Sequence, residues 1–238
     1  MKSNESSTRK TGNRALPKPH CVVKVGEGRG FVFEFRVPIP RAVRRQPRQL
    51  PGKPRLPNLA HRRVVLTAAH CLPNLPPAHA MAFSWERTFK GLLGSLDGSK
   101  NDVWAECRFV DPVGDIAVLG CPDEQEMGQQ SEAYHELVDE APAVRIGKLR
   151  FGRAWVLTLD GHWTPTPVEV LSGLYGTSLS IGQTLPGMSG SPILNDAGRA
   201  VGLVAIGGET ISKGKRQQVA MQGPQPILSR DLPARFIG

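Results

Sequence analysis

Short runs in which apolar and polar residues partly alternate recur along the chain, and Gly and Pro residues separate them. Such alternation is typical of half-buried strands, and many short strands with frequent turns favour an antiparallel sandwich or barrel. We expect strands at 21–25, 30–36, 63–67, 80–85, 89–93, 103–110 and 116–119, and again at 144–146, 154–159, 167–172, 178–181, 192–194, 200–206 and 217–222. The 26 Gly and 21 Pro among 238 residues agree with an all-β protein rich in turns.

One segment departs from this pattern. Residues 122–141 are acidic and carry the clearest helical periodicity of the chain. We interpret 122–142 as a connection between an N-terminal β-rich half, residues 21–121, and a C-terminal β-rich half, residues 143–238.

The net charge of +9 is distributed unevenly. Residues 1–63 hold 16 Lys and Arg against 3 Asp and Glu, a net +13, whereas residues 64–238 carry a net −4. We predict that residues 1–20, rich in Ser, Lys and Arg, form a disordered basic arm. The arm is either simply solvated or a surface for an acidic partner.

Residues 37–63 are dense in Pro and Arg. Because proline cannot donate to a strand ladder and like charges repel, we predict an extended insertion here. It is a solvated insertion, a regulatory or autocleaved loop, or a docking site for a partner. No aromatic residues are interleaved with its basic side chains, so we expect no nucleic-acid partner.

Three short motifs carry the candidate chemistry. They are Leu66-Thr-Ala-Ala-His70-Cys71, Asp115-Ile-Ala-Val-Leu119 and Gly187-Met-Ser189-Gly-Ser-Pro192. A serine hydroxyl needs a base within hydrogen-bond reach, and that base needs a third group to fix its tautomer. We predict Ser189 as the nucleophile, His70 as the base and Asp115 as the orienting acid. Ser191 is the alternative nucleophile.

The glycines of the last motif also have a predicted role. Gly187 permits a tight turn in which its own amide and that of Ser189 can converge on the developing oxyanion. We therefore predict an oxyanion hole built from the backbone of Gly187 and Ser189.

In their order, these motifs resemble those of the trypsin/chymotrypsin superfamily, and the serine motif is closer to the bacterial glutamyl-endopeptidase and HtrA-like branch. The resemblance implies two six-stranded antiparallel β-barrels with the active site in the cleft between them. It also implies a serine endopeptidase that works through an acyl-enzyme, with no cofactor. The rival hypothesis is a catalytically silent protein-binding module on the same fold.

The chain departs from the superfamily at two positions. Met188 stands where the digestive enzymes carry an Asp that pairs with a new N-terminus, so we expect no such activation. The usual disulfide partner of Cys71 is missing from residues 27–33, which leaves Cys21 as the only upstream candidate. With no apolar leader at the start of the sequence, we expect reduced thiols instead, in a cytoplasmic bacterial enzyme.

By the same resemblance, the primary specificity pocket has Gln183 and Thr184 at its floor and Val204, Ala205 and Gly207 along its wall. No acidic side chain stands there, and Val204 occupies the place of the His used by glutamyl enzymes. We therefore predict a neutral residue at the cleaved position of a protein or peptide substrate.

We expect neither a metal site nor a membrane partner. No two of the four cysteines have the Cys-x-x-Cys spacing of a zinc site, and the histidines other than His70 form no pattern. No run of apolar residues approaches the length of a membrane span. A regulatory protein partner is an open possibility, because a protease free in the cytosol needs restraint.

Overall fold

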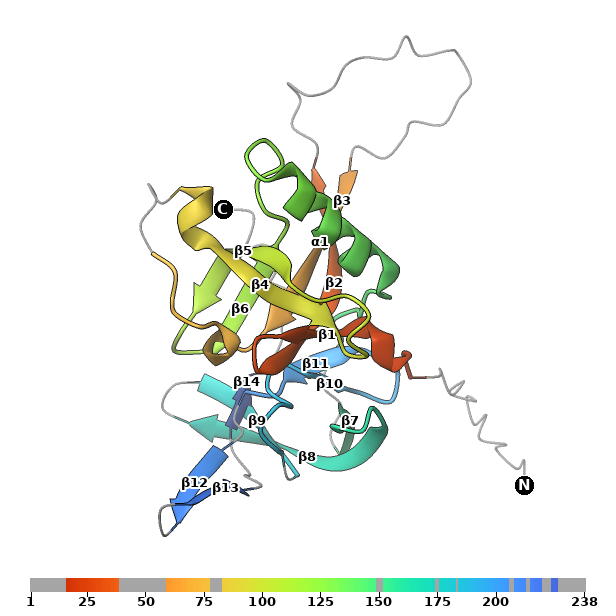
Figure 1. Cartoon of the computed structure of the whole chain (residues 1–238). Helices are drawn as coiled ribbons and strands as arrows, with labels where there is room; N and C mark the ends of the chain where they lie inside the picture. Colours follow the sequence, from red (N-terminus) through yellow and green to blue (C-terminus); the bar gives the residue numbers. More distant parts are fainter. Residues whose placement is uncertain are drawn as a thin grey trace, which may run out of the picture.

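The computed structural model describes residues 16–38, 59–77, 83–148, 152–173, 176–182, 184–205, 208–212, 215–219 and 224–226. Strands dominate this part of the chain, as expected (Figure 1). No helix in the described ranges is both long enough and apolar enough to cross a membrane.

The described part of the first half contains six strands and three short 3-10 helices, one of which precedes the first strand. They are η1 (Pro19–Cys21), β1 (Val22–Val25), β2 (Gly28–Pro38), β3 (Leu59–Thr67), η3 (Ala69–Cys71), η4 (Ser84–Arg87), β4 (Thr88–Ser95), β5 (Val103–Asp111) and β6 (Ile116–Gly120). The second half is preceded by α1 (Gly128–Glu140) and contains β7 (Gly152–Leu157), β8 (Trp163–Gly173), β9 (Gly176–Ile181), β10 (Pro192–Leu194), β11 (Ala200–Leu203), β12 (Gly208–Ser212), β13 (Lys215–Val219) and β14 (Pro224–Pro226).

The first six strands close into an antiparallel barrel in the order β1-β2-β3-β6-β5-β4. Neighbouring strands place buried apolar residues side by side: Phe31 is the register partner of Leu66, which in turn faces Val118. Every second residue of these strands points inward, and that alternation fills the barrel with packed side chains. The predicted N-terminal barrel is therefore confirmed.

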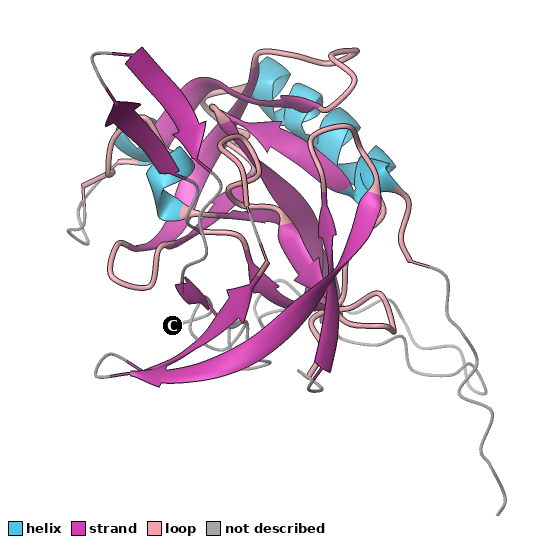
Figure 2. Ribbon diagram, turned by 90° about the horizontal axis from the view of Figure 1, so that it is seen from below, coloured by secondary structure: helices cyan, strands magenta, loops and turns pink. Residues whose placement is uncertain are grey.

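The second half forms a six-stranded antiparallel sheet in the order β11-β10-β7-β8-β9-β14, with β12 and β13 as a separate two-stranded ribbon. Figure 2 shows the long, curved strands of this sheet. Its inner face has its own apolar cluster, to which Val168, Leu179 and Ile193 belong. Closure of this sheet into a second barrel remains a prediction.

Helix α1 lies within the segment predicted to be helical and packs against the outside of the barrel (Figures 1 and 2). Its buried residues Tyr134, Leu137 and Val138 join the barrel core, and the Tyr134 hydroxyl donates to the Leu119 carbonyl at 3.1 Å. The last carbonyls of a helix lack partners within it. Arg63 supplies one: its guanidinium donates to the carbonyls of Val138, Asp139 and Ala141 at 2.8 to 3.2 Å.

The prediction of an extended loop over 37–63 is therefore wrong at both ends. Strands β2 and β3 stay paired as far as Pro38 and Leu59, and Arg63 has a structural role in capping α1. Proline is tolerated here because it stands at the end of the ladder. Residues 39–58 lie outside the described part of the chain.

Three other expectations need correction. Of the predicted disordered arm, residues 16–20 are ordered, with Leu16 packed on the core and the Pro17 carbonyl accepting from Trp163 Nε1 at 2.7 Å. The described part of the predicted strand 80–85 leads into the helical turn η4, in which Glu86 accepts a hydrogen bond from the Phe83 amide. The predicted strand 144–146 forms a single bridge from Ile146 to Ala200.

A buried charge stabilises the wall of the barrel. Glu106 on β5 is fully buried, and its carboxylate lies 3.1 Å from both Arg87 and Arg108 and accepts from the Ser84 hydroxyl. Glu106→Gln keeps the shape but removes the charge, so we expect a loss of about 1–3 kcal/mol in the free energy of unfolding, measured by denaturant titration. Arg153→Gln, which breaks the exposed pair with Asp196, is the matched control and should cost at most about 1 kcal/mol. Equal losses in the two variants would contradict the prediction.

Candidate active site

The structure brings together His70 and Asp115, which lie 45 residues apart in the sequence. His70 stands in the turn η3 directly after β3, and Asp115 precedes β6, the neighbour of β3 in the barrel. Asp115 Oδ2 lies 2.7 Å from His70 Nδ1, while Oδ1 accepts from the His70 backbone amide at 3.0 Å. The carboxylate thus contacts both the ring and the backbone of the histidine, an arrangement that favours a proton on Nδ1 and leaves Nε2 facing away from the carboxylate.

The turn between β5 and β6 aims the Asp115 carboxylate. Asp115 has a φ of 52°, a left-handed conformation that Asp adopts more readily than most residues. Asp111 holds the start of this turn, because its Oδ1 accepts from the amides of Val113 and Gly114 at 3.1 and 3.0 Å. A strained residue in a turn that is held in this way is common where a side chain must be aimed.

Ser189 lies in a tight turn before β10 and is nearly buried. The backbone amides of this turn differ in their hydrogen bonding. The amides of Met188, Gly190 and Ser191 donate to the carbonyls of Leu185, Val204 and Met188. Among the described residues, in contrast, none accepts a hydrogen bond from the amide of Gly187 or Ser189. These two amides are the ones predicted for the oxyanion hole, and the φ of 87° at Gly187 explains why glycine stands there.

The turn that carries Ser189 is attached directly to the first barrel. The Arg29 amide on β2 donates to the Ser189 carbonyl at 2.7 Å. A Cβ placed on Gly28 would lie 3.4 Å from the Ser189 Cβ and 2.5 Å from the Cys71 sulfur. Ser189 therefore lies beside the residue that follows His70. The described contacts include no hydrogen bond between the Ser189 hydroxyl and the His70 ring, and in an unliganded enzyme that bond is often long.

Gly190 makes the closest approach between this turn and β2. A Cβ on Gly190 would lie 1.8 Å from the Arg29 carbonyl oxygen, and its φ is 82°. We expect Gly190→Ala to force the turn away from β2, lowering the free energy of unfolding by about 2–3 kcal/mol and greatly reducing peptidase activity. Gly161→Ala is the control, since this glycine also has a positive φ, 83°, but has nothing within 4 Å of the added Cβ. Comparable activity loss in both variants would show that strain alone, rather than the contact with β2, is responsible.

Arg29 is a residue of the site that the sequence did not indicate. Its guanidinium is largely buried and donates to the carbonyls of Leu157, Thr158 and Leu159 at 2.9 to 3.3 Å. Burial lowers the pKa of this guanidinium. The side chain thereby joins the β7–β8 turn of the second half to β2, the strand whose Arg29 amide donates to the Ser189 carbonyl. Because the contacts are between residues more than 120 positions apart, no local pattern could reveal them.

All four cysteines are free thiols. Burial raises the pKa of Cys71 to about 11 and that of Cys21 to about 12, so both are protonated near neutrality. The alternative disulfide between Cys21 and Cys71 is absent. Gly28 occupies the position from which a side chain would reach the Cys71 sulfur, which explains why Cys71 has no partner on this strand.

The predicted specificity residues are only partly described. Thr184, Val204 and Ala205 are buried, whereas Gln183 and Gly207 lie outside the described residues. Val204 accepts from the Gly190 amide and donates to the Ser191 carbonyl at 2.9 Å, so it lies next to the turn of Ser189. Its side chain belongs to the apolar cluster of the second half, together with Met188. The buried Met188 forms part of that core and offers no charge for a new N-terminus.

The chain was compared with protein-family models, curated proteins and solved structures. The family model of the trypsin-like peptidase domain matches residues 58–203. No curated protein matches. Among solved structures, the chain is similar to the serine protease of a human pathogenic astrovirus, with 16% identity, 93% of this chain and 97% of that chain covered and a TM-score of 0.47. It is similar to the HtrA-type protease AlgW, with 16% identity, 93% of this chain and 64% of that chain covered and a TM-score of 0.44. It is also similar to the Rv3671c protease of M. tuberculosis in its inactive form, with 18% identity, 94% of this chain and 96% of that chain covered and a TM-score of 0.42.

These structural likenesses are distant, and the assignment depends on the domain match. That match and the first barrel define a serine peptidase. The chain belongs to the trypsin-like peptidase family.

Proposed function

We propose that this protein is a serine endopeptidase that uses His70, Asp115 and Ser189 as a catalytic triad. Ser189 attacks the peptide carbonyl while His70 takes its proton and then passes it to the leaving amine. Asp115 holds the imidazole and stabilises its charged form. Water then releases the acyl-enzyme, with His70 again as the base. The observation that carries the proposal is the pairing of His70 with Asp115 through Nδ1 at 2.7 Å, which leaves the opposite ring nitrogen available as a base.

The amides of Gly187 and Ser189, which donate to none of the described residues, support the second part of the proposed mechanism. A tetrahedral intermediate places negative charge on the former carbonyl oxygen, and fixed N–H donors stabilise that charge without rearranging. Gly187 and Ser189 supply two such donors from a turn whose other amides are engaged within the protein. We propose that these donors form the oxyanion hole.

A fluorophosphonate probe tests the proposed nucleophile, because it reacts only with a serine that is activated by its base. We expect stoichiometric labelling of the wild-type protein, with the label on the peptide that contains Ser189. Ser191→Ala should still be labelled, whereas Ser189→Ala should not. A folded wild-type protein that resists labelling would instead favour the rival hypothesis, a binding module without activity.

We propose further that the enzyme prefers a neutral residue at the cleaved position. Thr184 and Val204 are both uncharged and buried, and Val204 lies next to the Ser189 turn. Neither offers a counter-charge to Arg, Lys or Glu. Cleavage of a peptide library, with products identified by mass spectrometry, tests this preference. A profile dominated by Arg, Lys or Glu would overturn it.

We also propose that a protein partner or the Pro/Arg-rich insertion regulates the enzyme, and that it works in the cytoplasm. Four free thiols, three of them buried, support a reducing compartment. Shortening the segment between Pro38 and Leu59 tests the role of the insertion. Unchanged activity and specificity would remove the insertion from this proposal.

A further inference from the structure

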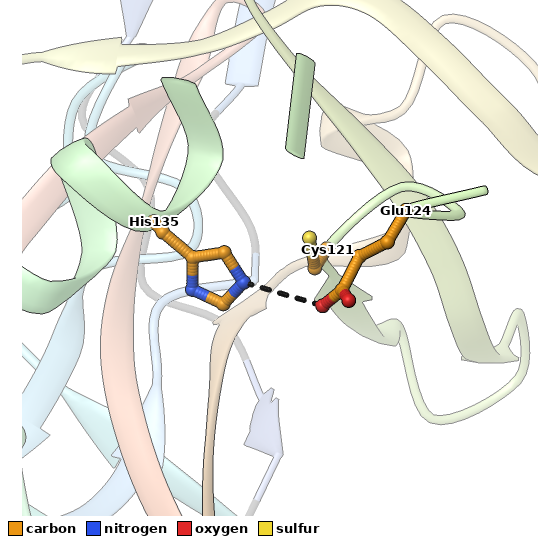
Figure 3. A group of neighbouring side chains, drawn as sticks. All are labelled: Cys121, Glu124 and His135. Atoms are coloured by element: carbon orange, nitrogen blue, oxygen red, sulfur yellow. Dashed lines mark ion pairs between the residues drawn. The ribbon is translucent and has the colours of Figure 1, made fainter. Parts of the chain in front are cut away.

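A group of metal-ligating side chains lies on the connection between the two halves (Figure 3). Cys121 directly follows β6, Glu124 stands in the next turn, and His135 is on α1. One ligand atom from each, the thiol sulfur, a carboxylate oxygen and an imidazole nitrogen, lies within 4.8 Å of the other two. Cys121 and Glu124 are three residues apart, and the turn and the helix bring His135, eleven residues after Glu124, to the same place.

The surroundings of His135 orient its ring toward this group. Nδ1 faces Asp139 Oδ2 at 3.5 Å, one helical turn further along α1, while Nε2 faces Glu124 Oε1 at 3.8 Å. Histidines that bind metals commonly have a carboxylate on the nitrogen that does not bind. Asp139 stands in that position toward Nδ1, and Nε2 is the nitrogen that faces the group.

Cys121 also has a polar neighbour. Its sulfur lies 2.9 Å from the Ser131 hydroxyl, which can donate to a thiolate. The Cys121 carbonyl is held by Arg108 at 2.6 Å, so the backbone that presents the thiol is fixed to β5. The side chains of Glu124 and His135 are exposed, so small rotations can bring the ligand atoms to the roughly 3–4 Å separations of a tetrahedral site.

We propose that Cys121, Glu124 and His135 bind a zinc ion, with water as the fourth ligand. The combination of thiolate, imidazole and carboxylate suits Zn²⁺, whereas Ca²⁺ and Mg²⁺ require mainly oxygen ligands. The site would tie the start of the connection, after β6, to the middle of α1. The proposal departs from the sequence-based expectation of no metal, and it is independent of the catalytic mechanism.

Titration of the chelator-treated full chain with Zn²⁺ alone, followed by calorimetry, tests the proposal. We expect one zinc ion per chain. Cys121→Ser and His135→Gln should each weaken binding by at least about 100-fold, and Asp139→Asn by about 10-fold through its effect on the ring. His162→Gln, which changes an exposed histidine elsewhere, should bind like the wild type. Circular dichroism verifies that each variant is folded.

A second measurement identifies the sulfur ligand without reference to activity. With Co²⁺ in place of Zn²⁺, we expect a thiolate-to-cobalt charge-transfer band in the wild type that Cys121→Ser lacks. Absence of stoichiometric zinc binding by the wild type would overturn the proposal. Undiminished binding by folded Cys121→Ser and His135→Gln would overturn it as well.

Discussion

Replacement of Ser189 by Ala is expected to lower kcat for peptide hydrolysis by at least about 10⁴-fold. In the proposed mechanism, the variant loses the atom that forms the covalent bond, while the amides of the turn still polarise the carbonyl and leave a small residual rate. KM should change little, since the hydroxyl contributes little to ground-state binding. Steady-state kinetics on a peptide substrate, with the protein concentration taken from absorbance, measure both quantities.

Ser191→Ala is the matched control for this loss. Ser191 is two residues away, and its hydroxyl is buried without a hydrogen-bond partner among the described residues. Removing a hydroxyl that has no hydrogen-bond partner among the described residues should leave kcat within about 10-fold of the wild type and should not destabilise the fold. If Ser191→Ala were inactive and Ser189→Ala active, the nucleophile would have to be reassigned.

The second large effect is expected for Asp115→Asn, which should lower kcat by about 10⁴-fold. If the Asn oxygen keeps the hydrogen bond from the His70 backbone amide, its NH₂ group faces His70 Nδ1 and donates to it. The ring then carries its proton on Nε2, the nitrogen that must accept the serine proton. Because the geometry is largely kept, we expect the loss in kcat with nearly unchanged KM and unfolding midpoint.

Asp111→Asn separates this effect from damage to the turn. Asp111 uses a single oxygen to accept from two amides of the same turn, and Asn can accept both bonds through its own Oδ1. We therefore expect kcat within about 10-fold of the wild type. A loss as large as that of Asp115→Asn would mean that turn geometry, rather than the histidine tautomer, limits the rate.

The sequence predicts those features that depend on neighbours along the chain. The short apolar runs at 63–67 and 116–119 located two barrel strands, and the turn residues around Gly187 identified a tight turn in which amides can converge. The acidic segment 122–141 contains α1. In each case the signal lies within one element, where the spacing of side chains reports directly on backbone geometry.

The features that the sequence does not predict arise from contacts over long separations. Arg63 stands in a segment of high positive charge, and only the packed helix shows that it caps α1. Arg29 likewise has no recognisable pattern until the β7–β8 turn lies against it. His135 had no apparent partner, because Cys121 and Glu124 reach it only through the fold of the connection.

The long pairing of β2 with β3 has a consequence for the tolerance of this protein to insertions. Pro38 and Leu59 are the last register partners of β2 and β3, so the two ends of the segment between them are held next to each other by paired strands. The entropy lost by closing such a segment grows only with the logarithm of its length, and each doubling costs roughly 0.6 kcal/mol. Lengthening or shortening the chain at this point therefore hardly affects the stability of the barrel, so new sequence can be acquired or exchanged here while the distant pairing of His70 with Asp115 is preserved.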